Sequence, residues 1–174
     1  VGNKAITRHN MMKNTAKILA LGMLFLFNSC EKDEDSTQIF ALNSEAYKGF
    51  LFESMKIINF PNSQNIIPDF TVLAQTNGSG EVLSPYLSNP NLENRFFLFD
   101  ELEDLKNAQE VFDSIQTTEI NTFQKFALDI KPYQIWLIKT NSGSVGKILI
   151  TETKTENIED KPFAEIKFKA KKLQ

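Results

Sequence analysis

The chain has very little of the two residue types on which much nucleophilic and metal chemistry depends. Its 174 residues include one cysteine, Cys30, and one histidine, His9. A lone cysteine has no partner for an intrachain disulfide, so the core alone must stabilise the fold. That histidine lies within the first ten residues, and without one in the rest of the chain we expect there neither a Ser-His nor a Cys-His nucleophile pair, nor a histidine–cysteine zinc site. A glycine-rich phosphate loop is also absent, and the sequence predicts a protein that is not an enzyme and has no metal site.

Long apolar runs are missing too. The run Ile18–Phe27 has about half the length of a helix that spans a bilayer, but it suits the apolar region of a secretory signal. Lys13 and Lys17 precede it and Cys30 follows closely, which is typical of a bacterial lipoprotein signal. Phe27 stands where such signals usually have leucine. The alternative, a buried core helix that ends near a cysteine, does not account for the flanking lysines.

This interpretation predicts four segments. Residues 1–10 lie upstream of the expected start at Met11 or Met12, residues 11–29 form the signal peptide, and residues 30–38 form an acidic tether. Residues 39–174 form a single β-rich domain. Cys30 would carry the lipid, and two or more acyl chains hold a protein stably on a membrane.

The charge balance argues against nucleic acid as a partner. The formal net charge is −3, and residues 1–29, all of which precede the expected lipid site, contain four basic residues and no acid, so the processed chain would have a charge of −7. An acidic domain does not attract a polyanion. The predicted partner is instead the membrane, through the lipid anchor.

An acidic run follows the expected lipid site: Glu31, Lys32, Asp33, Glu34 and Asp35. Runs of this kind are often solvated tethers. This one also resembles the export signal that Bacteroidetes lipoproteins carry behind the lipidated cysteine. The resemblance implies an outer-membrane lipoprotein on the cell surface. The periplasmic face of the outer membrane is the alternative.

Beyond the tether, the pattern predicts a mostly β, antiparallel, sandwich-like domain with one main α-helix. Strands are expected around residues 50–52, 55–58, 70–75 and 95–99, with a turn at 77–80. The helix is expected to begin with Asp100 as its cap, because Leu102, Leu105, Ala108, Val111, Phe112 and Ile115 recur at helical spacing. Residues 84–87 and 89–91 read as loops, which would expose Tyr86.

The last fifty residues predict three consecutive strands, 134–140, 145–153 and 163–171. In the last of them, apolar residues alternate with Glu165, Lys167, Lys169 and Lys171, as expected for one buried and one wet face. We interpret the lysines as a solvated face that also protects an edge strand, and a phosphate- or membrane-binding stripe is the alternative. Trp136 and Ile138 fall on one face of the first strand, and Ile135 and Leu137 on the other, which predicts a central strand.

The block Ile135–Glu152 (IWLIKTNSGSVGKILITE), followed by AEIKFKAK, resembles the carboxy-terminal hairpin of HmuY-like lipoproteins of Bacteroidetes. The stretches around Gly49–Phe52 and Asp69–Phe70 are loosely similar to early strands of that family. The resemblance covers about a quarter of the chain. It implies a mostly antiparallel β fold, and the type members of the family bind haem at the cell surface.

The chain departs from that family at the haem ligands. The type members hold iron between two histidines, and no histidine follows residue 9 here. Tyr47, Tyr86, Tyr133 and Met55 are the remaining candidate axial or binding ligands, but their spacing selects no pair. Each also suits a packed or rim position. No cofactor is therefore expected, and haem is disfavoured.

Two classes of function are expected from the sequence. The first is a surface-exposed binding lipoprotein that captures an unknown ligand or presents it to an outer-membrane receptor. It predicts a concave, aromatic-lined pocket near residues 78–91. The second is a non-catalytic accessory or interaction lipoprotein without a small-molecule pocket, which predicts a filled core and an exposed apolar patch.

Overall fold

Alternating apolar residues build two antiparallel sheets that pack face to face. The computed structural model describes residues 38–45, 48–116, 120 and 122–173, which belong to one compact unit, Glu34–Gln174. Its elements are β1 (Ile39–Asn43), β2 (Lys48–Leu51), β3 (Lys56–Asn59), β4 (Thr71–Thr76), β5 (Val82–Ser88), β6 (Phe96–Glu101), α2 (Leu105–Ser114), β7 (Phe126–Ala127), β8 (Gln134–Lys139), β9 (Val145–Ile158) and β10 (Lys161–Lys172). The expected mostly β, antiparallel, sandwich-like fold with one main helix is confirmed for these residues.

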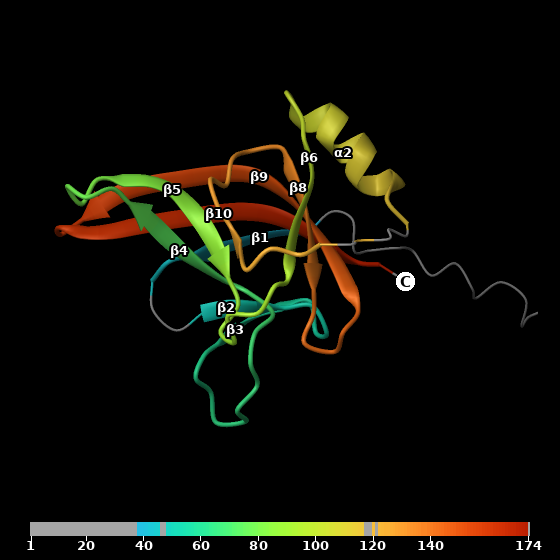
Figure 1. Ribbon diagram of the computed structural model, residues 1–174, viewed down its shortest axis with the longest axis horizontal. Coiled ribbons are helices and arrows are strands. Elements are labelled where there is room, and N and C mark those ends of the chain that lie inside the picture. The colour runs from blue at the N-terminus through green and yellow to red at the C-terminus, as the bar shows by residue number, and fades with distance from the viewer. Residues whose placement is uncertain (1–37, 46–47, 117–119, 121, 174) are drawn as a thin grey trace, which may run out of the picture. The chain divides into compact units, whose positions relative to one another are not determined.

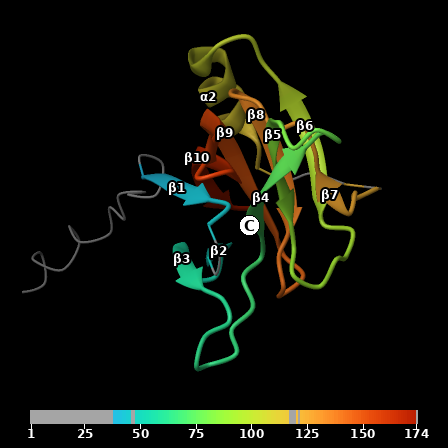
Figure 2. The same cartoon turned by 90° about the vertical axis from the view of Figure 1, so that its left-hand side faces the viewer.

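The larger sheet has the strand order β1-β10-β9-β8-β6, and the smaller has the order β4-β5-β7. β4 and β5 pack against β9 and β10, and Figure 1 shows them crossing in front of these two strands. The hairpin β2–β3 adjoins β1 and β4. Figure 2 shows the same elements from the side.

Phenylalanine fills the space between the two sheets. Five rings pack edge-to-face or tilted, except that Phe40 and Phe168 are stacked, with neighbouring centroids 4.8–6.2 Å apart: Phe40, Phe50, Phe52, Phe70 and Phe168. All five are buried. The edge-to-face pairs add to the stabilisation from apolar burial, because the positive edge of one ring meets the negative face of the other.

The helix α2 covers the other face of the larger sheet. Phe112 and Ala108 pack on Ile135, Leu137 and Leu149, while Trp136 and Ile138 face the phenylalanine core. β8 lies between β6 and β9, which confirms its prediction as a central strand with two apolar faces. The domain therefore has three layers, the small sheet, the large sheet and the helix.

The expected start of the helix is wrong. Asp104 is the cap, and its side chain accepts a hydrogen bond of 2.9 Å from the Asn107 amide. Asp100 lies in β6, because this strand continues to pair with β8 as far as Glu101, opposite Gln134. Strand pairing thus takes precedence over the capping signal at residue 100.

The predicted loop at residues 84–87 is also wrong, because these residues belong to β5. Leu73 pairs with Tyr86 and Ala74 with Pro85. Proline is tolerated there since β7 pairs only with Leu87 and Ser88, so the missing N–H of Pro85 faces no partner strand.

The lysine-bearing strand β10 is not an edge strand, contrary to expectation, since it lies between β1 and β9. Its alternation is as predicted, with Ala164, Ile166, Phe168 and Ala170 buried. The lysines lie on the helix side, where Lys167 pairs with Glu152 at 2.7 Å and Lys169 donates to Gln109 of α2. The pair with Glu152 raises the pKa of Lys167.

Candidate functional site

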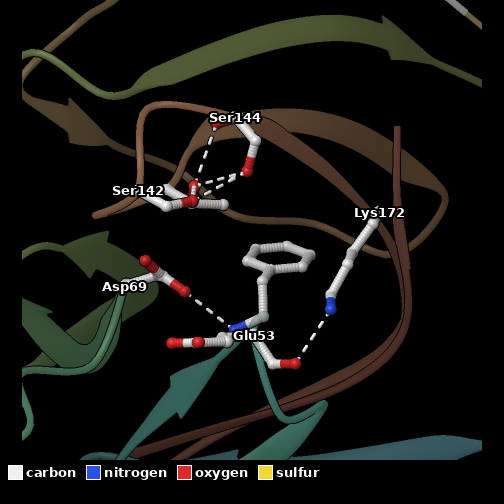
Figure 3. Close-up of a pocket in the computed structure, with 7 residues that line it drawn as sticks. Glu53, Asp69, Ser142, Ser144 and Lys172 are labelled. Atoms are coloured by element: carbon white, nitrogen blue, oxygen red, sulfur yellow. Dashed lines mark hydrogen bonds between the residues drawn. The ribbon is translucent and has the colours of Figure 1, made fainter. Parts of the chain in front are cut away.

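A cavity of about 150 Å³ opens where the β2–β3 turn, the loop before β4, the β8–β9 turn and the end of β10 meet. We call it the Phe52 cleft, and its lining residues are Phe52, Glu53, Asp69, Thr140, Ser142, Ser144 and Lys172. In Figure 3, Lys172 and Asp69 face the cleft from opposite sides, and Ser142 and Ser144 lie along a third side. The cleft therefore has an aromatic ring at its base and polar groups of both charges around it.

The base of the cleft depends on a glycine. Gly146 in β9 pairs with Lys172 in β10, and a Cβ atom on Gly146 would lie 2.3 Å from the ring of Phe52. No side chain can be accommodated at this distance without a shift of the ring. Gly146 thus allows Phe52 to pack against β9 beneath the cleft.

Asp69 holds three segments of the site together. One carboxylate oxygen accepts a hydrogen bond of 2.7 Å from the amide of Phe52, and the other accepts one of 2.6 Å from the amide of Asn141. The residue is 1% exposed. Asn141 in turn donates to the carbonyl of Ile67 and accepts from Arg95. Asp69 therefore fixes the β2–β3 turn and the β8–β9 turn on either side of the cleft.

Three hydroxyl groups gather in the β8–β9 turn, and we call them the hydroxyl cluster: Thr140, Ser142 and Ser144. Thr140 Oγ1 lies 2.9 Å from Ser142 Oγ and 2.8 Å from Ser144 Oγ, and the two serine oxygens are 3.0 Å apart. Gly143, with φ of +89°, allows the tight turn. The turn thereby presents the hydroxyl oxygens to the cleft.

Lys172 supplies the positive charge. Its Nζ donates a hydrogen bond of 2.8 Å to the carbonyl of Glu53, and Figure 3 shows the side chain reaching across to that carbonyl. Of the described residues, no carboxylate forms an ion pair with Lys172. The ammonium group is therefore available to a ligand.

The residues predicted from sequence do not come together. Tyr86 lies on the outward face of the small sheet, with its ring 6.1 Å from that of Phe126. Tyr133 packs in the cluster beneath α2, whereas Met55 packs against the phenylalanine core. Cys30, the acidic run 31–35 and Tyr47 lie outside the described residues. The structure thus brings no pair of Tyr86, Tyr133 and Met55 to a common site, and the cleft lies apart from the expected loops at 78–91.

Sequence reasoning missed the cleft because its members are distributed over 120 positions of the chain and none belongs to a motif. The clearest available signal is the run of small polar residues Asn141-Ser142-Gly143-Ser144, but by itself such a run indicates only a turn between two strands. The sequence also gives no indication that Lys147 is buried. This lysine is 1% exposed, and its Nζ donates hydrogen bonds to the carbonyl of Phe112 and to that of Ile115, the latter at 2.7 Å, at the end of α2. Its Nζ lies 4.6 Å from the ring centroid of Phe112.

Comparisons with family models, curated proteins and solved structures found no match. Within the described ranges, no helix has the length and apolar content needed to cross a membrane. The histidine, cysteine, aspartate and glutamate side chains of the same ranges form no group of three that could hold a metal ion. The Phe52 cleft is accordingly interpreted from its own geometry.

Proposed function

We propose that the protein is a lipid-anchored, non-catalytic binding lipoprotein of the outer membrane, exposed at the cell surface, that captures or presents a small polar ligand in the Phe52 cleft. The cleft itself carries this proposal. It combines an aromatic base, a buried carboxylate, a hydroxyl cluster and a lysine with no carboxylate partner among the described residues. A few convergent polar groups around a concave site are typical of ligand recognition.

The anchor is supported by the sequence around Cys30, and metabolic labelling tests it. Radiolabelled palmitate should be incorporated into the wild-type chain and into Ser29→Ala, which retains the cysteine. Cys30→Ser should remain unlabelled and should no longer sediment with the outer membrane. Equal labelling of Cys30→Ser would refute the anchor.

The ligand proposed for the cleft is not haem. Clefts for ligands of drug size have volumes of about 300–1,000 Å³, whereas this one has about 150 Å³. Titration of the protein with haemin at micromolar concentration should give no saturable shift of the Soret band. A one-to-one shifted band would instead support the haem function of the family that the chain resembles and direct attention to Tyr86, Tyr133 and Met55.

Small molecules released from the purified native protein test the cleft. Protein isolated from its own membrane would be denatured, and the released compounds identified by mass spectrometry. Ser144→Phe should fill the cleft and release none of the ligand. The control Ser79→Phe changes an exposed residue of the β4–β5 turn, outside the cleft, and should match the wild type. Identical profiles for wild type and Ser144→Phe would refute the proposal.

A second candidate, an accessory lipoprotein that binds another protein, is favoured by one observation. The outward face of the small sheet carries Leu73, Tyr86 and Phe126, of which Leu73 is 37% exposed and the two rings are half-buried. Together with a core filled by phenylalanine, this apolar face fits the alternative. Loss of a co-purifying membrane protein in Tyr86→Ser, but not in Ser144→Phe, would favour it over ligand capture.

A further inference from the structure

We propose that the ligand of the Phe52 cleft is a small zwitterionic amino acid, with its carboxylate on Lys172 and its ammonium group against Asp69 and the hydroxyl cluster. The inference rests on the binding function proposed above and names its ligand class. Four properties of the cleft carry it, namely the free donors of Lys172, the buried charge of Asp69, the shortage of hydrogens in the hydroxyl cluster and the size of the cavity.

Lys172 provides the site for the carboxylate. Its ammonium group has three N–H donors, and one of them binds the carbonyl of Glu53. Two donors are left, and no carboxylate of the described residues pairs with this lysine. A ligand carboxylate at this position gains charge-assisted hydrogen bonds, which are stronger than bonds between neutral groups.

Asp69 lies across the cleft from Lys172 and, as a carboxylate, can bind a positively charged donor of the ligand. The residue is 1% exposed, and each carboxylate oxygen accepts one backbone N–H. A carboxylate offers about four acceptor sites, so each oxygen retains capacity for another donor. In the part of the chain that the structure describes, no basic side chain forms an ion pair with Asp69. Buried charges are normally paired, and a ligand ammonium group would pair this one.

The hydroxyl cluster also calls for a donor. Its three hydroxyl hydrogens must serve four close contacts, since Thr140 Oγ1 lies 3.1 Å from the Ser144 carbonyl in addition to the three contacts between hydroxyl oxygens. One contact therefore always lacks a hydrogen, while lone pairs remain free. An N–H donor from a ligand satisfies these lone pairs.

The charges discriminate between ligand classes. A simple carboxylic acid would bring its negative charge towards Asp69 and the carboxylate of Glu53, and a simple amine would bring its positive charge towards Lys172. A neutral sugar would bring no charge to pair with either Lys172 or Asp69. A zwitterion can pair its carboxylate with Lys172 and its ammonium group with Asp69.

The size of the cavity limits how large the side chain of a bound amino acid can be. A cavity of about 150 Å³ in another protein accommodates benzene, and the Phe52 cleft has a similar volume. Alanine has the same number of non-hydrogen atoms as benzene, and glycine and serine differ from it by one. Larger amino acids would have to extend through the opening of the cleft.

Isothermal titration of the intact lipidated protein in detergent tests the inference. The probes are L-alanine, ethylamine with the ammonium group alone, propionate with the carboxylate alone, and glucose. L-alanine should bind saturably, and each single-charge analogue should bind at least about tenfold more weakly, because one charge-assisted contact is lost. Lys172→Gln should weaken alanine binding by a similar factor. Lys172→Arg should restore it, and Lys171→Gln should remain within about twofold of wild type.

Failure of this inference is distinguishable from failure of the binding function. If propionate, ethylamine or glucose binds as tightly as alanine, the zwitterion is refuted while the cleft remains a binding site. If none of the four probes binds a folded protein, the amino acid is refuted as ligand, and the compounds released from native protein decide the binding function separately. Unchanged alanine binding in Lys172→Gln would place the ligand elsewhere and refute the inference as well.

Discussion

Replacement of Lys147 by methionine should remove a pH-dependent part of the stability. Lys147 extends from β9 into the space beneath α2, where its Nζ donates to the carbonyls of Phe112 and Ile115 at the end of the helix. The partial negative charge of these helix carbonyls offsets part of the cost of burying the positive charge, but not all of it. Methionine has a similar length and packs in the same space without a charge.

The structure sets the sign and size of the effect. Burial, with a smaller contribution from Lys171, lowers the pKa of Lys147 from 10.5 to about 8, and Asp113 opposes this shift. Between these two pH values the unfolded chain binds a proton that the folded chain has lost, so the free energy of unfolding increases with pH. Each pKa unit corresponds to about 1.4 kcal/mol. The contribution of Lys147 to the free energy of unfolding should therefore increase by about 3 kcal/mol from pH 7 to 10.5.

Urea unfolding at pH 7, 8, 9, 10 and 10.5 measures this increase. The difference in the free energy of unfolding between wild type and Lys147→Met should change by about 3 kcal/mol over this range, while contributions from other titrating groups cancel. Lys139→Met, which changes an exposed lysine, should follow the wild type. Parallel curves for wild type and Lys147→Met would refute the burial of a charged lysine beneath α2.

Two further substitutions test local features of the fold. Asp104→Ala should lower the free energy of unfolding by about 1 kcal/mol, because it removes the helix cap, whereas Asp100→Ala should change it by less than about 0.5 kcal/mol; the reverse order in urea unfolding would restore residue 100 as the cap. Gly146→Ala should cost about 1–3 kcal/mol through overpacking against Phe52, and Gly78→Ala, where a Cβ meets no atom within 4 Å, is the matched control. Equal thermal midpoints for the two alanine variants would contradict the packing described at the base of the cleft.

The features that sequence predicts well are those encoded by local alternation. The two apolar faces of β8 follow from Ile135 to Ile138, since successive side chains of a strand point to opposite faces. The buried row of β10 follows in the same way. These patterns are local, and the tertiary structure agrees with them.

The features that sequence misses depend on contacts between distant residues. Pro85 indicates a loop until its pairing geometry is known, because only a strand without a neighbour on one side tolerates it. Lys147 has the sequence appearance of a solvated lysine, and only the placement of α2 shows that it is buried. The Phe52 cleft joins residues from 52 to 172, and no local pattern indicates that Asp69 and Lys172 face each other.

Amide chemical shifts of the protein during titration with L-alanine test the central claim most directly. We predict saturable shifts at Phe52, Asn141, Ser142 and Ser144, with none at Tyr86, because the ligand should bind in the cleft and not on the outward face of the small sheet. Shifts confined to Tyr86 and its neighbours, or the absence of any shift at saturating alanine, would contradict the assignment of the cleft as an amino-acid site.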